Sequence, residues 1–131
     1  MKFTLSWLKQ HLETNSDIET ILKKLTNIGL EVESSYNPSE ALNGFIAAKI
    51  ISTKPHPDAD RLQLCLIDTG TEEIEIVCGA KNAKEGLTTI YAPVGSTIPA
   101  SGMKLKKAKI RGIESSGMLC SEKELNLCDD S

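Results

Sequence analysis

Residues 62–77 have the sequence LQLCLIDTGTEEIEIV, which predicts two antiparallel β-strands joined by a tight turn. Residues 62–67 are mostly apolar, whereas residues 73–77 alternate between glutamate and aliphatic side chains. Alternation with a period of two places the aliphatic side chains on one face of a strand and the glutamates on the other. The intervening segment Asp68-Thr69-Gly70-Thr71 is typical of a hairpin connection, so we expect the two segments to pair.

Three further segments of β character surround this hairpin, at residues 45–52, 87–92 and 105–110. Glycines separate the segments, at Gly70, Gly79, Gly86, Gly95, Gly102 and Gly112. Short strands divided by glycine-containing turns are typical of a small barrel or sandwich. The pattern predicts a mainly β protein built on a five-stranded Greek-key barrel.

The first 37 residues have helical rather than strand periodicity. Apolar side chains recur at helical spacing in two runs, Trp7, Leu8, His11 and Leu12, then Ile18, Ile21, Leu22, Leu25 and Ile28. Ser16 and Glu19 have the spacing of a capping box, and Gly29 is suited to ending the second helix. Residues 36–39 break the pattern. We therefore expect a two-helix segment over residues 1–38 and a barrel domain over residues 39–131.

The composition of the 131 residues, 40% hydrophobic and 25% charged, is that of a folded globular domain. No apolar run approaches the roughly 20 residues that a membrane-spanning helix requires. The amphipathic N-terminus does not have the pattern of a secretory signal peptide. These features predict a cytoplasmic protein that does not contact a membrane.

The cysteines, Cys65, Cys78, Cys120 and Cys128, include no Cys-x-x-Cys pair, and the only histidines are His11 and His56. This spacing argues against a zinc site. Reduced thiols that act as small buried apolar groups are the favoured interpretation, and a disulfide between neighbouring strands is the alternative.

The net charge of −3 argues against a uniformly basic surface, but the charges are unevenly distributed. Five cations and no acid fall within residues 104–111: Lys104, Lys106, Lys107, Lys109 and Arg111. The apolar phase shifts between Leu105 and Ala108, as a β-bulge would cause, and this leaves the basic side chains facing solvent. A strand of this kind can follow a phosphate backbone. Alternatively, its lysines only keep an edge strand from aggregating.

Aromatic side chains are scarce in the predicted barrel. Phe45 and Tyr91 both lie inside apolar segments, where a core position is expected. Binders of single-stranded nucleic acid usually stack bases on aromatic side chains. Any nucleic acid bound here is therefore expected to be contacted through its phosphates, with low sequence specificity.

Two clusters have the residue types of catalytic or metal sites. Residues 56–60, HPDAD, combine a histidine with two carboxylates, but the two prolines in residues 55–57 favour a structured turn over a divalent-metal site. Residues 114–121 offer serines and a thiol without a histidine nearby in the sequence to activate them. No glycine-rich phosphate loop is present. We therefore expect no catalytic residue and no metal site.

Several ordered motifs resemble a known family. Residues 56–70 (HPDADRLQLCLIDTG), 76–82 (IVCGAKN) and 109–127 (KIRGIESSGMLCSEKELNL) are similar to the tRNA-binding module of the oligonucleotide-binding (OB) fold. Residues 1–12 (MKFTLSWLKQHL) and 25–34 (LTNIGLEVES) resemble the start of bacterial phenylalanyl-tRNA synthetase β subunits. The resemblance covers essentially the whole chain and implies an OB-fold barrel.

The resemblance also implies a parent enzyme. Such β subunits work with an α subunit in an α2β2 complex that attaches phenylalanine to its tRNA, using ATP and Mg²⁺, and the catalytic centre lies in the α subunit. The chain is then an N-terminal piece without cofactor or catalytic site, and its barrel domain is truncated at the C-terminal end. Its helices form half of a split domain, so the apolar face of the second helix is expected to be under-buried. The alternatives are a free-standing dimeric tRNA-binding protein of the same fold, or a protein-docking module with little RNA contact.

For tRNA binding, the resemblance implicates the basic segment, the Ser116-Gly117-Met118 turn, and Lys81 and Asn82 after the third strand. Ser116 can donate to a phosphate, and Gly117 allows close approach of the backbone. Met118 either contacts RNA or fills the core. Many relatives have proline where this chain has Lys81.

Overall fold

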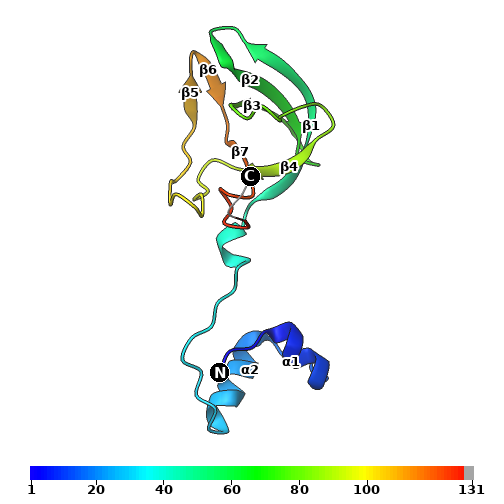
Figure 1. Cartoon of the computed structure of the whole chain (residues 1–131), viewed down its shortest axis with the longest axis vertical. Coiled ribbons are helices and arrows are strands. Elements are labelled where there is room, and N and C mark those ends of the chain that lie inside the picture. The colour runs from blue at the N-terminus through cyan, green and yellow to red at the C-terminus, as the bar shows by residue number, and fades with distance from the viewer. Residues whose placement is uncertain (129–131) are drawn as a thin grey trace. The chain divides into compact units, whose positions relative to one another are not determined.

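The computed structural model describes residues 1–128, which divide between two compact units with the boundary between Asn37 and Pro38. The first unit is helical and the second is built mainly from antiparallel strands, as predicted (Figure 1). Within the described residues, no helix has both the length and the apolar character needed to cross a membrane.

The helical unit contains α1 (Leu5–His11) and α2 (Ile18–Asn27). The predicted capping box at Ser16 is wrong by one residue. The Asp17 carboxylate caps α2 by accepting a hydrogen bond of 2.7 Å from the Thr20 N–H, and this bond lowers the pKa of Asp17. An ionised carboxylate is favoured at this position because it both accepts the free N–H groups and interacts with the helix dipole.

The apolar face of α2 is only partly covered. Ile21 is buried and Leu25 is half-buried, whereas Ile18 is 43% exposed and Ile28 is 72% exposed. This agrees with the expected under-burial of the face. That the helices are half of a split domain stays a prediction.

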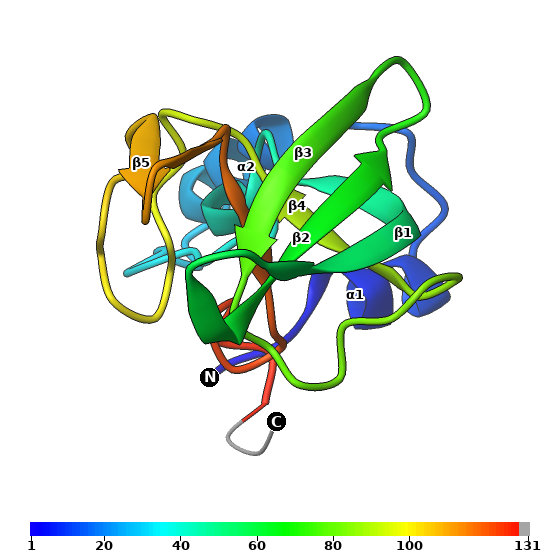
Figure 2. The same ribbon diagram turned by 90° about the horizontal axis from the view of Figure 1, so that it is seen from above.

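The second unit begins with a short 3-10 helix, η1 (Glu40–Leu42), and continues into a curved five-stranded antiparallel sheet. Its strands are β1 (Ile46–His56), β2 (Ala59–Asp68), β3 (Glu73–Cys78), β4 (Thr88–Ala92) and β7 (Met118–Cys120), in the order β3-β2-β1-β4-β7. Two short strands, β5 (Ala108–Ile110) and β6 (Ile113–Ser115), form a separate hairpin. The sheet curls so that β3 approaches β6 and β7, which produces an OB-like barrel (Figure 2).

The hairpin predicted from residues 62–77 is confirmed. Strands β2 and β3 pair from Asp68↔Glu73 to Gln63↔Cys78, and the Asp68 carboxylate accepts a 2.7 Å hydrogen bond from the Gly70 N–H in the turn. Gly70 has a φ of +87°, a conformation that favours glycine. The predicted alternation is also observed, because Ile76 is fully buried while Glu73 and Glu75 are exposed.

The core of the barrel has two clusters. The first includes Ile50, Ile67, Ile76 and Tyr91, and the second includes Ile98, Leu105 and Leu125 with Phe45 packed against it. The predicted core positions of Phe45 and Tyr91 are therefore confirmed. Cys65, Cys78 and Cys120 are buried as free thiols, which supports the interpretation of reduced cysteines that act as small apolar groups.

The predicted strand at residues 105–110 is largely wrong, because only residues 108–110 form a strand. Strands β6 and β7 were not predicted. Each has three residues, and the two are separated by Ser116 and Gly117, so neither is long enough to show alternation.

Burial makes two of the thiols hard to ionise. Desolvation raises the pKa of Cys65 and of Cys120 from 9.0 to about 11, with smaller contributions from Cys78 and Glu124 respectively. At pH 8 the thiolate fraction of each falls about 100-fold below that of an ordinary cysteine.

We predict that iodoacetamide alkylates Cys65 and Cys120 at least about 100-fold more slowly in the folded chain than in guanidinium, measured by peptide mass spectrometry. Equal rates in the two states would contradict this burial.

Candidate nucleic-acid interface

The five cations of residues 104–111 are all exposed, but they do not lie on one strand as predicted. Lys104 forms an isolated bridge with Thr97, and of the five only Lys109 lies in β5. The reason is Leu105, which is buried in the second core cluster and exchanges backbone hydrogen bonds of 2.8 Å with Gly95 and Ser96. This pairing draws the start of the segment away from β5, and Lys106 and Lys107 connect the two parts.

The end of the basic segment forms the tip of the β5–β6 hairpin. Ile110 pairs with Ile113, and the two residues between them, Arg111 and Gly112, have φ values of +49° and +88°. Positive φ at both central residues is typical of a type I′ turn, which matches the twist of the flanking strands. Arg111 is thus presented at an exposed hairpin tip.

One of the five cations already has an acidic partner. Lys107 Nζ lies 2.7 Å from Glu114 Oε1, and both side chains are 60% exposed. An ion pair with this exposure contributes about 1 kcal/mol or less and is screened by salt, so a phosphate can compete for the lysine. For the other four cations, residues 1–128 provide no ion pair.

His56 fixes the position of the hairpin relative to the β1–β2 turn. The side chain is 5% exposed, its Nδ1 accepts a hydrogen bond from the Asp58 N–H at 3.0 Å, and its Nε2 lies 3.2 Å from the Ile110 carbonyl oxygen. Since Nδ1 accepts, Nε2 carries the proton and donates to Ile110, which lies between Lys109 and Arg111. The HPDAD segment is thus a structured turn, as predicted. Its link to the basic segment was not foreseen, because it joins residues 54 positions apart.

The described part of the chain contains no group of three or more histidine, cysteine or acidic side chains placed to hold a metal ion.

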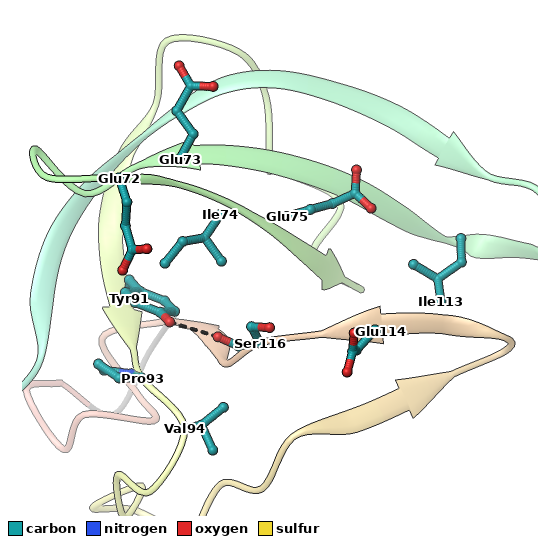
Figure 3. Close-up of a pocket in the computed structure, with 10 residues that line it drawn as sticks. All are labelled: Glu72, Glu73, Ile74, Glu75, Tyr91, Pro93, Val94, Ile113, Glu114 and Ser116. Carbon is teal, nitrogen blue, oxygen red and sulfur yellow. Dashed lines mark hydrogen bonds between the residues drawn. The ribbon is translucent and has the colours of Figure 1, made fainter.

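The Ser116-Gly117-Met118 turn is packed tightly against β4. The Tyr91 hydroxyl donates a 2.7 Å hydrogen bond to the Ser116 carbonyl oxygen (Figure 3). A Cβ on Gly117, whose φ is +128°, would lie 2.5 Å from both the Ala92 carbonyl oxygen and Tyr91 Cε2. Met118 is half-buried against the second core cluster. Gly117 and Met118 therefore have structural roles, while the half-buried Ser116 side chain remains next to the hairpin.

Lys81 and Asn82 are exposed in the connection between β3 and β4. No hydrogen bond or ion pair of the described chain joins them to the β5–β6 hairpin.

A groove of about 700 Å³, which we call the β3–β6 groove, opens beside the hairpin (Figure 3). Four carboxylates line it, those of Glu72, Glu73, Glu75 and Glu114, together with Tyr91 and several aliphatic side chains. Burial raises the pKa of Tyr91, with a smaller contribution from the negative charge of Glu72. The groove is thus acidic, and a polyanion is repelled from it.

Comparison with known proteins gives one family match. Residues 45–131 match the family described as "Putative tRNA binding domain". The matched range includes the whole basic segment, the Ser116-Gly117-Met118 turn and the β3–β6 groove.

Curated relatives are similar over nearly the whole chain. The "Phenylalanine--tRNA ligase beta subunit" of Rhodospirillum rubrum is 53% identical over 99% of this chain and 16% of its own length. The protein of the same description from Cereibacter sphaeroides is 50% identical over 99% of this chain and 17% of its own length. The chain thus spans about a sixth of the length of these relatives.

Among solved structures, the C-terminal domain of Plasmodium vivax p43 matches with a TM-score of 0.45 and 25% sequence identity. The match covers 57% of this chain and 43% of that chain.

The close contact at Gly117 predicts a specific cost of substitution. We expect Gly117→Ala to lower the free energy of unfolding by about 3 kcal/mol, because the added Cβ clashes with backbone and ring atoms. Gly86→Ala is the matched control, since Gly86 has a φ of +85° but open space around its Cβ position, and it should cost only about 1–2 kcal/mol. Guanidinium denaturation followed by circular dichroism measures both. Equal losses would show that Gly117 is required only for its backbone conformation.

Proposed function

Residues 45–131 belong to the tRNA-binding domain family, and on that basis we propose that this chain is the tRNA-binding portion of a phenylalanine–tRNA ligase β subunit. The observation that carries the proposal is the group of exposed cations gathered between Lys104 and Arg111 inside the matched domain. The identity of about 50% to β subunits over 99% of the chain supports the choice of parent enzyme over a free-standing tRNA-binding protein.

The activity of the whole protein is part of the same proposal. The parent attaches phenylalanine to its tRNA in an ATP-dependent and Mg²⁺-dependent reaction in the cytoplasm, together with an α subunit in an α2β2 complex. In this proposal ATP and Mg²⁺ are held elsewhere in that complex. This chain would contribute tRNA contacts and no reacting group.

In the proposed contact, the cations bind phosphates of the tRNA backbone. Lys104, Lys106, Lys109 and Arg111 are exposed and without an acidic partner among the described residues, so they are available to an RNA backbone without breaking an ion pair. Lys107 joins them when a phosphate replaces Glu114 as its partner. Contacts of this kind position an RNA without reading its bases.

Three further polar groups belong to the proposed contact. The Ser116 hydroxyl lies next to the hairpin and donates to a phosphate, while Lys81 and Asn82 form a second, smaller contact. Gly117 and Met118 act indirectly by holding the turn against β4. Bases do not stack on Tyr91, because its ring is buried.

The basic segment predicts a strong salt dependence of tRNA binding. About five phosphate contacts imply that the affinity for phenylalanine tRNA falls about 100-fold to 500-fold between 50 and 200 mM salt. The triple reversal Lys106→Glu, Lys107→Glu and Lys109→Glu should weaken binding by more than about tenfold and flatten the salt dependence. Filter binding measures both effects. The matched control reverses three exposed lysines of the helical unit, Lys2, Lys9 and Lys23. Equal losses in the two triple variants would overturn the proposed contact.

The His56 hydrogen bonds predict an effect on binding without any change of charge on the basic segment. His56→Ala removes the donor to the Ile110 carbonyl and frees the hairpin tip, so we expect tRNA affinity to fall about threefold to tenfold. Thr53→Ala, at a half-buried position of the same strand outside this contact, is the control. Both variants are to be measured well below their unfolding temperatures. Unchanged affinity in His56→Ala would show that tRNA binding does not require the hydrogen bond between His56 and Ile110.

A further inference from the structure

The β3–β6 groove is left unused by the proposed RNA contacts. It lies along the outer edge of β3, which is the last strand of the five-stranded sheet. Between its lining residues Glu114 and Ser116 lies Ser115, whose hydroxyl accepts a 3.2 Å hydrogen bond from the Val77 N–H of β3. Residues of β3 line the groove on one side and residues of β6 line it on the other (Figure 3).

The edge of β3 offers free backbone groups to this groove. Because the Val77 N–H points toward Ser115, it points away from β2. In an antiparallel ladder the backbone groups of alternate residues point to the same side, so those of Glu73 and Glu75 also point outward. In the described part of the chain no strand pairs with this side of β3. Two residues therefore present unpaired N–H and C=O groups along the groove.

The side chains around the groove are sorted onto two faces. On β3, Glu73 and Glu75 are exposed on one face, while the half-buried Ile74 points to the other face, toward Tyr91 (Figure 3). On β6, Glu114 is exposed and Ile113 is half-buried. A strand lying between β3 and β6 would have carboxylates beside one of its faces and aliphatic side chains beside the other.

The chain itself contains a strand of the complementary kind. Residues 107–111, KAKIR, alternate between basic and apolar side chains and include β5, which pairs with β6 along its opposite edge. There Lys109 lies opposite Glu114, and Lys107 forms the 2.7 Å ion pair with the same carboxylate. β6 thus already accepts a strand with this alternation.

We propose that the β3–β6 groove binds an extended segment of a partner protein in which lysine or arginine alternates with aliphatic residues. The segment adds to the edge of β3 as a further strand. Its backbone pairs with Glu73 and Glu75, its cations lie beside the carboxylates of Glu73, Glu75 and Glu114, and its aliphatic side chains cover Ile74 and Ile113. The groove is not part of the proposed tRNA contact, because its negative charge repels a polyanion.

The probe is a fluorescein-labelled heptapeptide in which valine and lysine alternate, added to the full 131-residue chain and followed by fluorescence anisotropy. We expect saturable binding that slows hydrogen exchange of the Glu73 and Glu75 amides. The double variant Glu73→Lys and Glu75→Lys should weaken binding by about tenfold or more. The neutral double variant Glu73→Gln and Glu75→Gln should weaken it less. The matched control reverses two exposed glutamates that do not line the groove, Glu31 and Glu85, and should bind as the unaltered chain does.

Two further results distinguish strand addition from charge attraction and from self-association. A heptapeptide with the same side chains but N-methylated amides keeps its charge and cannot form the backbone ladder, so it should not bind. Equal binding of this peptide, equal weakening in the control variant, or no binding at 1 mM peptide would each overturn the proposal. So would light scattering showing that two copies of the chain associate through the groove, because the occupant would then be a second copy.

Discussion

The Ser115 hydroxyl makes the contact on which the arrangement of the barrel depends. It accepts a hydrogen bond from the Val77 N–H of β3 and donates a hydrogen bond of 3.2 Å to the Gly117 carbonyl oxygen. The Tyr91 hydroxyl donates to the carbonyl oxygen of Ser116, the residue between Ser115 and Gly117. These bonds fix the corner at which the chain passes from the β5–β6 hairpin into β7. The residue is 3% exposed, so its hydroxyl must be fully hydrogen-bonded to be buried without a large penalty. The corner therefore positions the β5–β6 hairpin relative to β3.

The elements that the sequence predicts well are those whose residues supply their own signal. The β2–β3 hairpin follows from the alternation around Ile76 and from the turn at Gly70, both of which are local. The reduced cysteines and the core position of Tyr91 follow from their apolar surroundings. In each case burial of apolar area and turn geometry act over a few residues, so the pattern alone is sufficient.

The features that the sequence did not reveal depend on contacts between distant segments. The interleaved apolar and basic residues of 105–110 predict one strand, but burial of Leu105 in the second core cluster divides it. The sequence around His56 predicts only a turn, because the hydrogen bond from His56 to the Ile110 carbonyl forms only when the barrel brings the two residues together. The resemblance implies that Gly117 allows the backbone to come close to a tRNA phosphate. In the structure, the missing side chain allows close packing against Tyr91 and Ala92 of β4. The residue types of the candidate site are thus readable from sequence, and their roles are set by tertiary packing.

The two surfaces of opposite charge meet on the β5–β6 hairpin, where the free energy that couples them can be bounded. The Lys107–Glu114 ion pair joins them, because Lys107 belongs to the basic segment and Glu114 lines the β3–β6 groove. With both side chains 60% exposed, the pair contributes about 1 kcal/mol or less, which limits coupling through it to about fivefold in affinity. A partner in the groove that withdraws Glu114 frees Lys107 for a phosphate, so coupling through this pair favours joint occupancy. Since this bound is small against the total effect of several phosphate contacts, the two surfaces act nearly independently although they lie on the same hairpin.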